Sequence, residues 1–496
     1  MMHTRRRHTA SAASAVAIAS VILFSLAGAQ NLTFAPVPAP SPGATGSSLT
    51  NNPIPVPAGN GVYLGASLDW DWDQPNNISQ RLGYPMLTYG IFLNFPLTFA
   101  DVDFMNVTVR TKPFPIKSKD GSQAQIMLTL QPVEVTAIDD TTLNNQTVLD
   151  DVVTMVRQLN EAGVSVFVRF GHEMNGWWYA WGWRPMQYKK AFRKVAQAIK
   201  ACPTCTKTAM LWAPQVATGF PWGLDVPYTN ASWFLEHTDY ARVNVTEVAT
   251  LDSNGDGIIS LGDEPYLPFY PGDDVVDWVG MSIYFTGINF YGENILPTPD
   301  TFIHAIRGLQ PEFLNQQAPD FYGIYSVQKN KPFCLAETSA NWNSRTAAAN
   351  ASAPTMLQMK QAWWQQTVSD SVFDRLPNYR ASFLFEFIKL GEDVKTLSFD
   401  YGYTTTPEVA AAFHNDAPAR VVWSDGTYSS INGRTNLVAG TGTQKTSATA
   451  ATAAGSQATG APGVAGSTKP GSAVAKNPAS LAALVAATLI ALVLAI

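Results

Sequence analysis

The sequence contains few cysteines and few charged residues. Three cysteines in 496 residues exclude a small scaffold held by disulfides, so stability must come from a hydrophobic core. Only 14 % of the residues are charged, and 32 Lys and Arg face 38 Asp and Glu with no basic stripe, so nucleic acid is not an expected partner. Aromatic residues, in contrast, reach 11 % and include 14 Trp. Exposed indole rings suit the C–H faces of sugars, although for any single Trp a place in the core is the alternative.

The N-terminus has the pattern of a secretory signal. A basic stretch at Arg5–His8 precedes an apolar run over residues 12–26, and Ala27-Gly28-Ala29 is a small-residue cleavage site. We therefore expect residues 1–29 to be removed and the protein to be secreted. A retained membrane anchor is the alternative.

Two further features agree with an extracellular location. Seven Asn-x-Ser/Thr sequons predict exposed, glycosylated loops; they begin at Asn31, Asn77, Asn106, Asn145, Asn230, Asn244 and Asn350. Cys202 and Cys205, in the sequence Cys-Pro-Thr-Cys, could close a small disulfide loop in an oxidising compartment, a redox or zinc role being the alternative. Cys334 lies in an apolar run and is expected to be a buried thiol.

The C-terminus has the pattern of a glycosylphosphatidylinositol (GPI) attachment signal. Residues 431–471 form a stalk rich in Ser, Thr, Ala and Gly, and residues 472–496 end in a continuous apolar run with no basic cluster after it. The anchored protein would lie at the outer face of the plasma membrane or in the cell wall. A retained transmembrane helix is the alternative.

Residues 59–430 alternate between short apolar runs and helix-length amphipathic stretches, after a Pro/Gly/Ser-rich arm at 30–58. Strands are expected at 62–67, 86–93, 125–130, 164–170, 208–212, 275–282, 332–336 and 379–387. Helices are expected at 147–161, 185–200, 299–309 and 354–372. Eight strands alternating with helices predict an α/β fold, a (β/α)8 TIM barrel with its active site at the C-terminal ends of the strands. A doubly wound dinucleotide-binding sheet is disfavoured because no GxGxxG motif opens the first unit.

The densest group of polar and aromatic residues follows the fourth expected strand. His172, Glu173, Asn175 and three Trp lie within about a dozen residues of one strand end. The pair His172-Glu173 does not begin a zinc HExxH motif, because Gly176 stands where the second His would be. A carboxyl group among aromatic side chains is a candidate general acid, since an apolar setting raises its pKa.

A second acid, Glu337, ends the seventh expected strand and is also close to a Trp. Carboxylates from the fourth and seventh strands can face each other across the mouth of a barrel. Glycoside hydrolysis requires two such groups, one to protonate the leaving oxygen and one to attack the anomeric carbon. For a single Glu at a strand end, a salt bridge or helix cap is the alternative.

These segments resemble glycoside hydrolase family 26, the β-mannanase family. Residues 169–182, Arg-Phe-Gly-His-Glu-Met-Asn-Gly-Trp-Trp-Tyr-Ala-Trp-Gly, resemble its acid/base segment, and Ala336-Glu337 is similar to its nucleophile strand. Gly61–Gly65 resembles its first strand and Val276–Tyr284 its sixth. The resemblance spans residues 60–420.

The resemblance implies a retaining mechanism in which Glu173 is the acid/base and Glu337 the nucleophile. It places His172 beside the acid, where it binds sugar, and Tyr284 against the nucleophile as a hydrogen-bond donor. Further substrate-binding candidates are Asn175, Trp178, Trp181, Trp212 and Trp342. It implies cleavage of internal β-1,4 bonds in mannan-type polysaccharide by a monomer that needs no cofactor for catalysis.

Three features depart from this pattern or stand outside it. The fifth strand leads to Gln215 where the resemblance predicts Asn, which leaves the substrate contacts open. The first strand runs into Asp69-Trp-Asp-Trp72, which is either a further sugar site or a solvated loop. Glu386, near the end of the eighth strand, faces either the mouth or a buried structural partner.

An insertion at 252–264 matches the spacing of a calcium-binding loop. The predicted ligands are Asp252, Asn254, Asp256, the Ile258 carbonyl and Asp263, with Ser260 acting through water. Position twelve of the loop is Asp rather than the bidentate Glu, and a simple Asp/Asn/Gly turn is the alternative. Such a Ca²⁺ would be structural.

Two other functions remain open at this point. The first is the same chemistry on another β-glycan or on xylan. The second is a cell-wall carbohydrate-binding protein that keeps the barrel without turnover, against which the presence of both glutamates argues.

Overall fold

The computed structural model describes residue 49 and residues 52–222, 245–287, 293–310, 316–344, 352–390 and 398–434. The predicted signal segment 1–29 and terminal segment 472–496 lie outside these residues, as does most of the arm and of the stalk. The end of the arm packs on the barrel, since Ile54 is buried and Asn52 donates a hydrogen bond to the Asp277 carbonyl oxygen (3.0 Å). None of the helices in these ranges is long and apolar enough to cross a membrane.

Eight parallel strands form a closed barrel. They are β1 (Val62–Leu68), β2 (Thr88–Asn94), β4 (Gln125–Gln131), β5 (Ser165–Phe170), β6 (Thr208–Trp212), β7 (Trp278–Phe285), β10 (Phe333–Ala340) and β12 (Tyr379–Glu386). Each strand pairs with the next in this order, and β12 returns to pair with β1 from Tyr63↔Ala381 to Leu68↔Glu386. The predicted (β/α)8 barrel is therefore confirmed.

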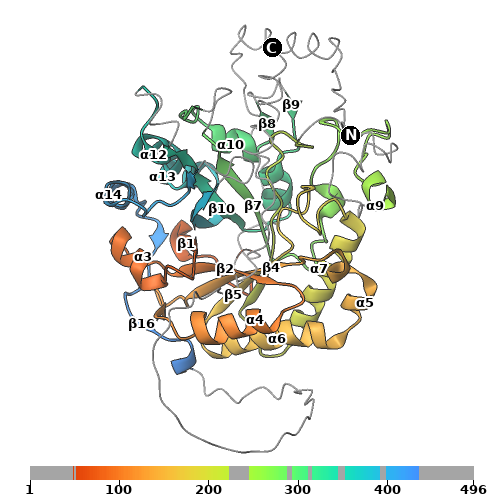
Figure 1. Cartoon of the computed structure of the whole chain (residues 1–496), viewed down its shortest axis with the longest axis horizontal. Helices are drawn as coiled ribbons and strands as arrows, with labels where there is room; N and C mark the ends of the chain where they lie inside the picture. Colours follow the sequence, from red (N-terminus) through yellow and green to blue (C-terminus); the bar gives the residue numbers. More distant parts are fainter. Residues whose placement is uncertain are drawn as a thin grey trace, which may run out of the picture.

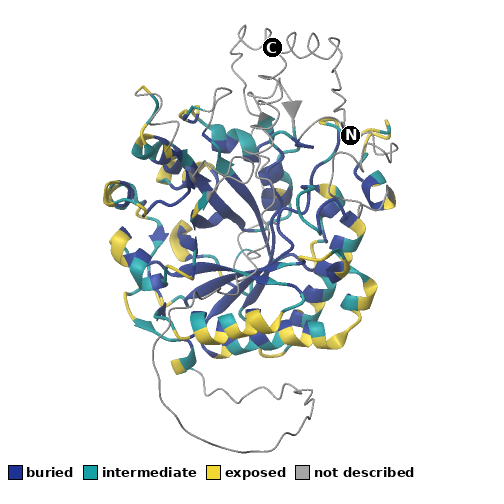
Figure 2. Cartoon of the chain, in the orientation of Figure 1, coloured by how far each residue is buried: buried dark blue, intermediate teal, exposed yellow. Residues whose placement is uncertain are grey.

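Helices surround the barrel (Figure 1). They are α3 (Pro75–Leu82), α4 (Phe99–Asp103), α5 (Asp140–Leu143), α6 (Gln146–Glu161), α7 (Pro185–Lys200), α9 (Val245–Ala249), α10 (Thr301–Ile306), α12 (Met356–Thr367), α13 (Asp370–Arg375) and α14 (Pro407–Asp416). Short 3₁₀ or π-helical segments are η1 (Ala58–Asn60), η2 (Phe104–Val109), η3 (Val135–Ile138), η4 (Leu267–Phe269), η5 (Tyr322–Gln328) and η6 (Asn432–Arg434). Helix α6 shows why they form: Leu149, Val152, Val156 and Leu159 recur at helical spacing and are buried, whereas its outer face is exposed (Figure 2).

Short strands add to this barrel. They are β3 (Phe114–Pro115) paired with β16 (Tyr428–Ser429), β8 (Leu309–Gln310) paired with β9 (Gln316–Gln317), the group β11 (Trp342–Asn343), β14 (Ser398–Asp400) and β13 (Ile388–Leu390), and β15 (Val421–Val422) beside β1. The β11–β14–β13 sheet follows β10 and β12 in the chain, so it lies at the carboxyl ends of these barrel strands. A small aromatic cluster there consists of Phe385 of β12, Phe399 of β14 and Tyr401.

All eight expected strands are present, but the bounds of two of them differ from the prediction. The apolar residues Val275 and Val276 belong to a turn whose N–H groups donate to the Gly272 carbonyl, so β7 begins at Trp278. Strand β10 was expected to end at Ala336 and continues to Ala340, because its polar residues after Glu337 are buried within the barrel. The expected helix 354–372 is two helices, since Ser369 caps a new one by accepting from the Val372 N–H (3.4 Å).

The cysteines are distributed as expected from the sequence. Cys202 and Cys205 form a disulfide in the turn between α7 and β6, with 5.4 Å between their Cα atoms. Cys334 is a free thiol buried in β10. One short disulfide loop constrains little of the unfolded chain, so the barrel core supplies the stability.

Candidate active site

Glu173 lies three residues beyond the end of β5, at the carboxyl-terminal mouth of the barrel. Its backbone is in the left-handed region, with φ of 53°, and Gly171 before it has φ of 52°. The Glu173 N–H donates to the Ala213 carbonyl oxygen (3.0 Å), and its own carbonyl accepts from the Gly176 N–H (3.0 Å). Non-glycine residues are uncommon in this region and are enriched at functional sites.

Glu337 is placed by an irregularity in β10. The pairing of β10 with β7 shifts between Leu335 and Glu337, and its pairing with β12 shifts between Leu335 and Thr338. A bulge of this kind re-aims a side chain that regular alternation would point elsewhere. Glu337 lies inside β10, whereas the sequence pattern predicted it at the end of that strand.

Two side chains, a buried arginine and a tyrosine, hold the Glu337 carboxylate. Arg169 of β5 is fully buried and forms an ion pair with Oε1, while Tyr284 of β7 donates to Oε2 (2.5 Å). Arg169 also donates through Nη2 to the Ser282 hydroxyl (2.6 Å). The contact from Tyr284 is the one that the family resemblance implies, and two donors on one carboxylate stabilise its charged form.

Glu173 is in a different setting from Glu337. Trp178 Nε1 donates to its Oε2 (3.1 Å). Gln215, with its carboxamide nitrogen facing the nearby acceptors, donates to Oε1 (3.1 Å) and to the Ser282 carbonyl (3.2 Å). Burial, and next the charge of Glu337, raise the pKa of Glu173 to about 7. Glu173 therefore keeps its proton in a large fraction of molecules near neutral pH.

His172, next to the acid, is neutral. Burial, followed by the charges of Arg169 and Lys389, holds the pKa of His172 well below its ordinary value. Its Nε2 shares a hydrogen bond with the Tyr179 hydroxyl (2.9 Å), while the buried Nδ1 has no partner. This buried ring nitrogen keeps an unused hydrogen-bonding capacity.

The predicted sugar platforms divide into two groups. Trp178 and Trp342 are partly exposed, as a contact surface requires. Trp181 and Trp212 do not fit that role, since both are buried. Trp181 stacks on Tyr179 (4.1 Å between ring centroids) and donates to the His172 carbonyl, and Trp212 packs in the core.

Asn175 is also engaged within the protein. Its Nδ2 donates to the Gln215 carbonyl (2.8 Å) and its Oδ1 accepts from the Gln215 N–H (2.8 Å). The predicted substrate-binding residue therefore ties the segment after β5 to the segment after β6. It positions Gln215, whose side chain reaches Glu173.

The sequence interpretation gave no role to Arg169 or Ser282 and treated Gln215 only as a departure. Arg169 carried a usable signal, because a charged residue inside the apolar run Val166–Phe170 must find a buried partner. Ser282 and Gln215 carried none, since their contacts depend on which strands are neighbours.

Glu386, at the end of β12, is separate from this pair of acids. Its Oε1 accepts from the Tyr403 N–H (2.7 Å), and its Oε2 accepts from the N–H and hydroxyl of Thr404 (3.2 and 2.8 Å). These bonds hold the loop that follows β14, which favours the structural alternative for Glu386.

The calcium-loop-like insertion is folded around its own backbone. Asp252 accepts from the N–H groups of Gly255, Asp256 and Gly257, and Asp263 accepts from Ser253, Asn254 and Ser260. Across the described residues, no three His, Cys, Asp or Glu side chains are grouped as metal ligands would be. Calcium binding by this loop stays a prediction.

Comparisons with known proteins give one family match. Residues 120–233, which include Glu173, match the model of glycosyl hydrolase family 26. No curated protein matches the chain.

Among solved structures, a β-mannanase of this family from Bacteroides ovatus is 14 % identical, with a TM-score of 0.41 over 75 % of this chain and 93 % of that one. The Bacillus subtilis mannanase BCman is also 14 % identical, with a TM-score of 0.38 over 80 % of this chain and 99 % of that one. Similarities at this level carry no inference about substrate.

Proposed function

We propose that the barrel is the catalytic domain of a retaining glycoside hydrolase that cleaves internal β-1,4 bonds of mannan-type polysaccharide. One observation carries the proposal: two buried carboxyl groups at the mouth lie in different polar settings. Glu173 has a pKa raised to about 7, and Glu337 accepts hydrogen bonds from a buried Arg and a Tyr. Such a pair supplies the acid and the nucleophile of glycoside hydrolysis. The family match over residues 120–233, which include Glu173, supports the role of Glu173 in this assignment.

In the first step, a Glu337 carboxylate oxygen bonds to the anomeric carbon. The bond between that carbon and the glycosidic oxygen breaks, and this oxygen takes the proton of Glu173. The products are a glycosyl ester on Glu337 and a free chain end. Since Tyr284 and Arg169 occupy fixed positions on β7 and β5, they orient the carboxylate before the sugar arrives.

In the second step, Glu173 acts as a base. Once Glu337 is an ester, its negative charge is gone, and the charge was the second cause of the raised pKa of Glu173. Arg169 then remains as a nearby positive charge that favours ionised Glu173. Glu173 can now take a proton from water, whose oxygen attacks the anomeric carbon and releases Glu337.

The side chains around Glu173 are suited to a neutral sugar. His172 is uncharged and Trp178 presents a partly exposed indole within 3.1 Å of the acid. An indole face offers an apolar surface to the C–H groups of a pyranose, and polar atoms at its edge fix the hydroxyl groups. The mannan assignment itself rests on the resemblance to the β-mannanase family, and another β-glycan or xylan would need the same two glutamates.

Hydrolysis of a panel of β-1,4-mannan, mixed-linkage β-glucan and xylan, followed by reducing-sugar release and product size, tests the proposal. We expect fastest release from mannan and a rapid fall in chain length, which indicates internal cleavage. Glu337→Ala and Glu173→Ala should each lower the rate by orders of magnitude, whereas Glu161→Gln, an exposed surface change, should not. Inversion at the anomeric carbon, measured by NMR, would contradict the mechanism. Binding of mannan without turnover would indicate the carbohydrate-binding alternative.

We also propose that a GPI anchor holds the mature protein outside the plasma membrane, and that loop 252–263 binds a structural Ca²⁺. Support for both comes from sequence pattern: an apolar terminus after a stalk of small residues, and the Asp-x-Asn-x-Asp-Gly spacing. Neither takes part in the catalytic steps.

A further inference from the structure

The turn after β1 presents one tryptophan almost entirely to solvent. Trp72 is 84 % exposed, whereas Trp70, two residues earlier, is buried and donates from Nε1 to the Gly90 carbonyl oxygen (3.0 Å). The largest apolar side chain is among the most costly to leave in water. Among the described residues, Trp72 is the only tryptophan in the exposed class, so its indole face is open to a ligand.

The turn that carries Trp72 is fixed in place. The N–H groups of Trp72 and Asp73 donate to the Asp69 carbonyl oxygen (3.0 and 2.8 Å). Lys112 Nζ donates to the carbonyl oxygens of Trp70 (2.5 Å) and Asp73 (2.8 Å). An aromatic side chain on a backbone that is already ordered loses little further entropy when a ligand stacks on it.

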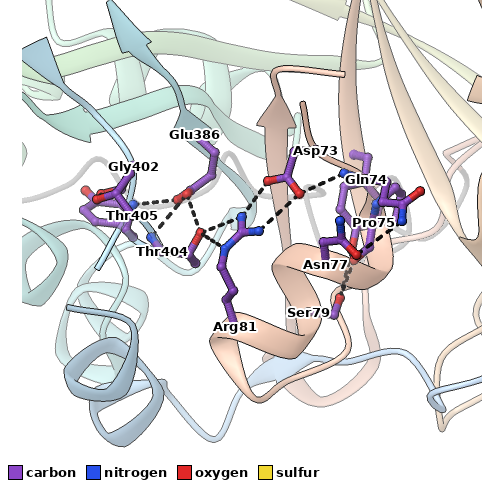
Figure 3. A network of polar contacts seen from close by, with 12 residues as sticks. Asp73, Gln74, Pro75, Asn77, Ser79, Arg81, Glu386, Gly402, Thr404 and Thr405 are labelled. Carbon is purple, nitrogen blue, oxygen red and sulfur yellow. Dashed lines mark hydrogen bonds and ion pairs between the residues drawn. The ribbon is translucent and has the colours of Figure 1, made fainter. Parts of the chain in front are cut away.

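A polar network anchors the same turn to the carboxyl end of β12 (Figure 3). Asp73 accepts from both terminal nitrogens of Arg81 (2.5 and 3.3 Å), and Arg81 in turn donates to the Thr404 hydroxyl (3.0 Å). Thr404 donates to Glu386 Oε2 (2.8 Å). The network joins the segment after β1 to the loop that holds Glu386, so the position of Trp72 relative to the barrel is set from two sides.

This anchored turn lies at the same end of the barrel as the two catalytic glutamates. It follows the carboxyl end of β1, which pairs with β2 on one side and β12 on the other. Phe92 of β2 contacts His172 edge-to-face (5.9 Å between centroids), which connects this side of the mouth to the acid/base segment. A polysaccharide chain that extends from the site on this side would pass the carboxyl ends of β2, β1 and β12.

We propose that Trp72 is a stacking platform for a sugar unit of the polysaccharide chain, distant from the bond that is cleaved. The inference rests on the proposed hydrolase function and adds a binding residue to it. Asp71, exposed beside Trp72, can accept hydrogen bonds from sugar hydroxyl groups. The acidic side chains of Asp69, Asp71 and Asp73 disfavour an anionic membrane surface, so a neutral polysaccharide fits this turn better.

The test compares Trp72→Ala with wild type on polymeric β-1,4-mannan and on a short mannose oligomer. We expect KM for the polymer to rise about threefold or more with kcat unchanged, and little change for the oligomer, which does not reach the rim. Trp72→Phe keeps an aromatic face and should recover most of the affinity. Ile116→Ala changes a partly exposed apolar residue whose carbonyl accepts from Ala124, just before β4; it is the control and should match wild type.

The side chain of Trp72 is exposed, so the melting temperature of Trp72→Ala should equal that of wild type. A second measurement uses the inactive Glu337→Ala protein with and without Trp72→Ala, retained on insoluble mannan. Weaker retention of the double variant supports the platform. Equal retention and equal KM would overturn it while leaving hydrolysis intact, whereas a wild-type protein that hydrolyses none of the panel would refute the hydrolase function itself.

Discussion

The ionisation of Glu173 gives the most direct test of the site. Burial is the largest cause of its raised pKa, and the charge of Glu337 is the second. The acid must carry its proton in the first step, so kcat/KM should fall on the alkaline side with a midpoint near pH 7. At pH 8, about one molecule in eleven would still be protonated, and the rate should be about tenfold below its maximum.

Replacing Glu337 with Gln separates the two causes. Gln keeps an oxygen that can accept from Arg169, so the buried guanidinium is not left without a partner, as it would be in Glu337→Ala. The negative charge is lost, so the pKa of Glu173 should drop below about 7. It should remain above its ordinary value of 4.5, because burial is unchanged.

Carboxyl ¹³C shifts in glutamate-labelled Glu337→Gln protein, titrated from pH 3 to 9, would measure this pKa. The resonance of Glu173 is identified by its absence from the Glu173→Gln/Glu337→Gln double variant. Glu161→Gln in the same background is the control and should leave the titration unchanged. A pKa of Glu173 that is equal with and without the Glu337 charge would refute the electrostatic coupling, and a flat rate profile from pH 6 to 9 would refute its role as the acid.

Four further outcomes are expected. Because the pKa of Glu173 is 4.5 unfolded and about 7 folded, the folded state holds the proton more tightly, and the free energy of unfolding of wild type should fall by at most about 3 kcal/mol as pH rises through this range. Glu173→Gln removes this loss, so its stability relative to wild type should be greater at pH 8 than at pH 4. Equal pH dependence of chemical denaturation in both proteins would contradict it. Tyr284→Phe removes the 2.5 Å bond to Glu337 and should lower kcat/KM by about tenfold to hundredfold; an unchanged value would exclude a role for that hydroxyl. Chelation should lower the melting temperature if loop 252–263 holds Ca²⁺, and an unchanged melting temperature with no metal by elemental analysis would show that the loop is only a turn. Phosphatidylinositol-specific phospholipase should release the mature protein from membranes, whereas detection of residues 481–496 by mass spectrometry would exclude the GPI signal.

The amino-acid sequence was sufficient for the architecture and for the two acids. Alternation of apolar runs with amphipathic stretches is a local property, and it located all eight strands and the helix Pro185–Lys200 to the residue. Glu173 and Glu337 were visible because each interrupts or ends an apolar run next to aromatic residues. Strand bounds near 275 and 336 were less accurate, since apolar residues in a turn and buried polar residues in a strand both disturb the local pattern.

The tertiary structure alone decided how these residues act. Arg169, Ser282 and Gln215 lie on three strands or the segments after them, and only barrel closure brings them around the two carboxyl groups. Burial separates Trp212, which packs in the core, from Trp72, which projects from an anchored turn, although both follow or end a strand in the sequence. Charge and burial depend on neighbours from distant segments, so the pKa of Glu173 and the exposure of each tryptophan could not be read from local sequence.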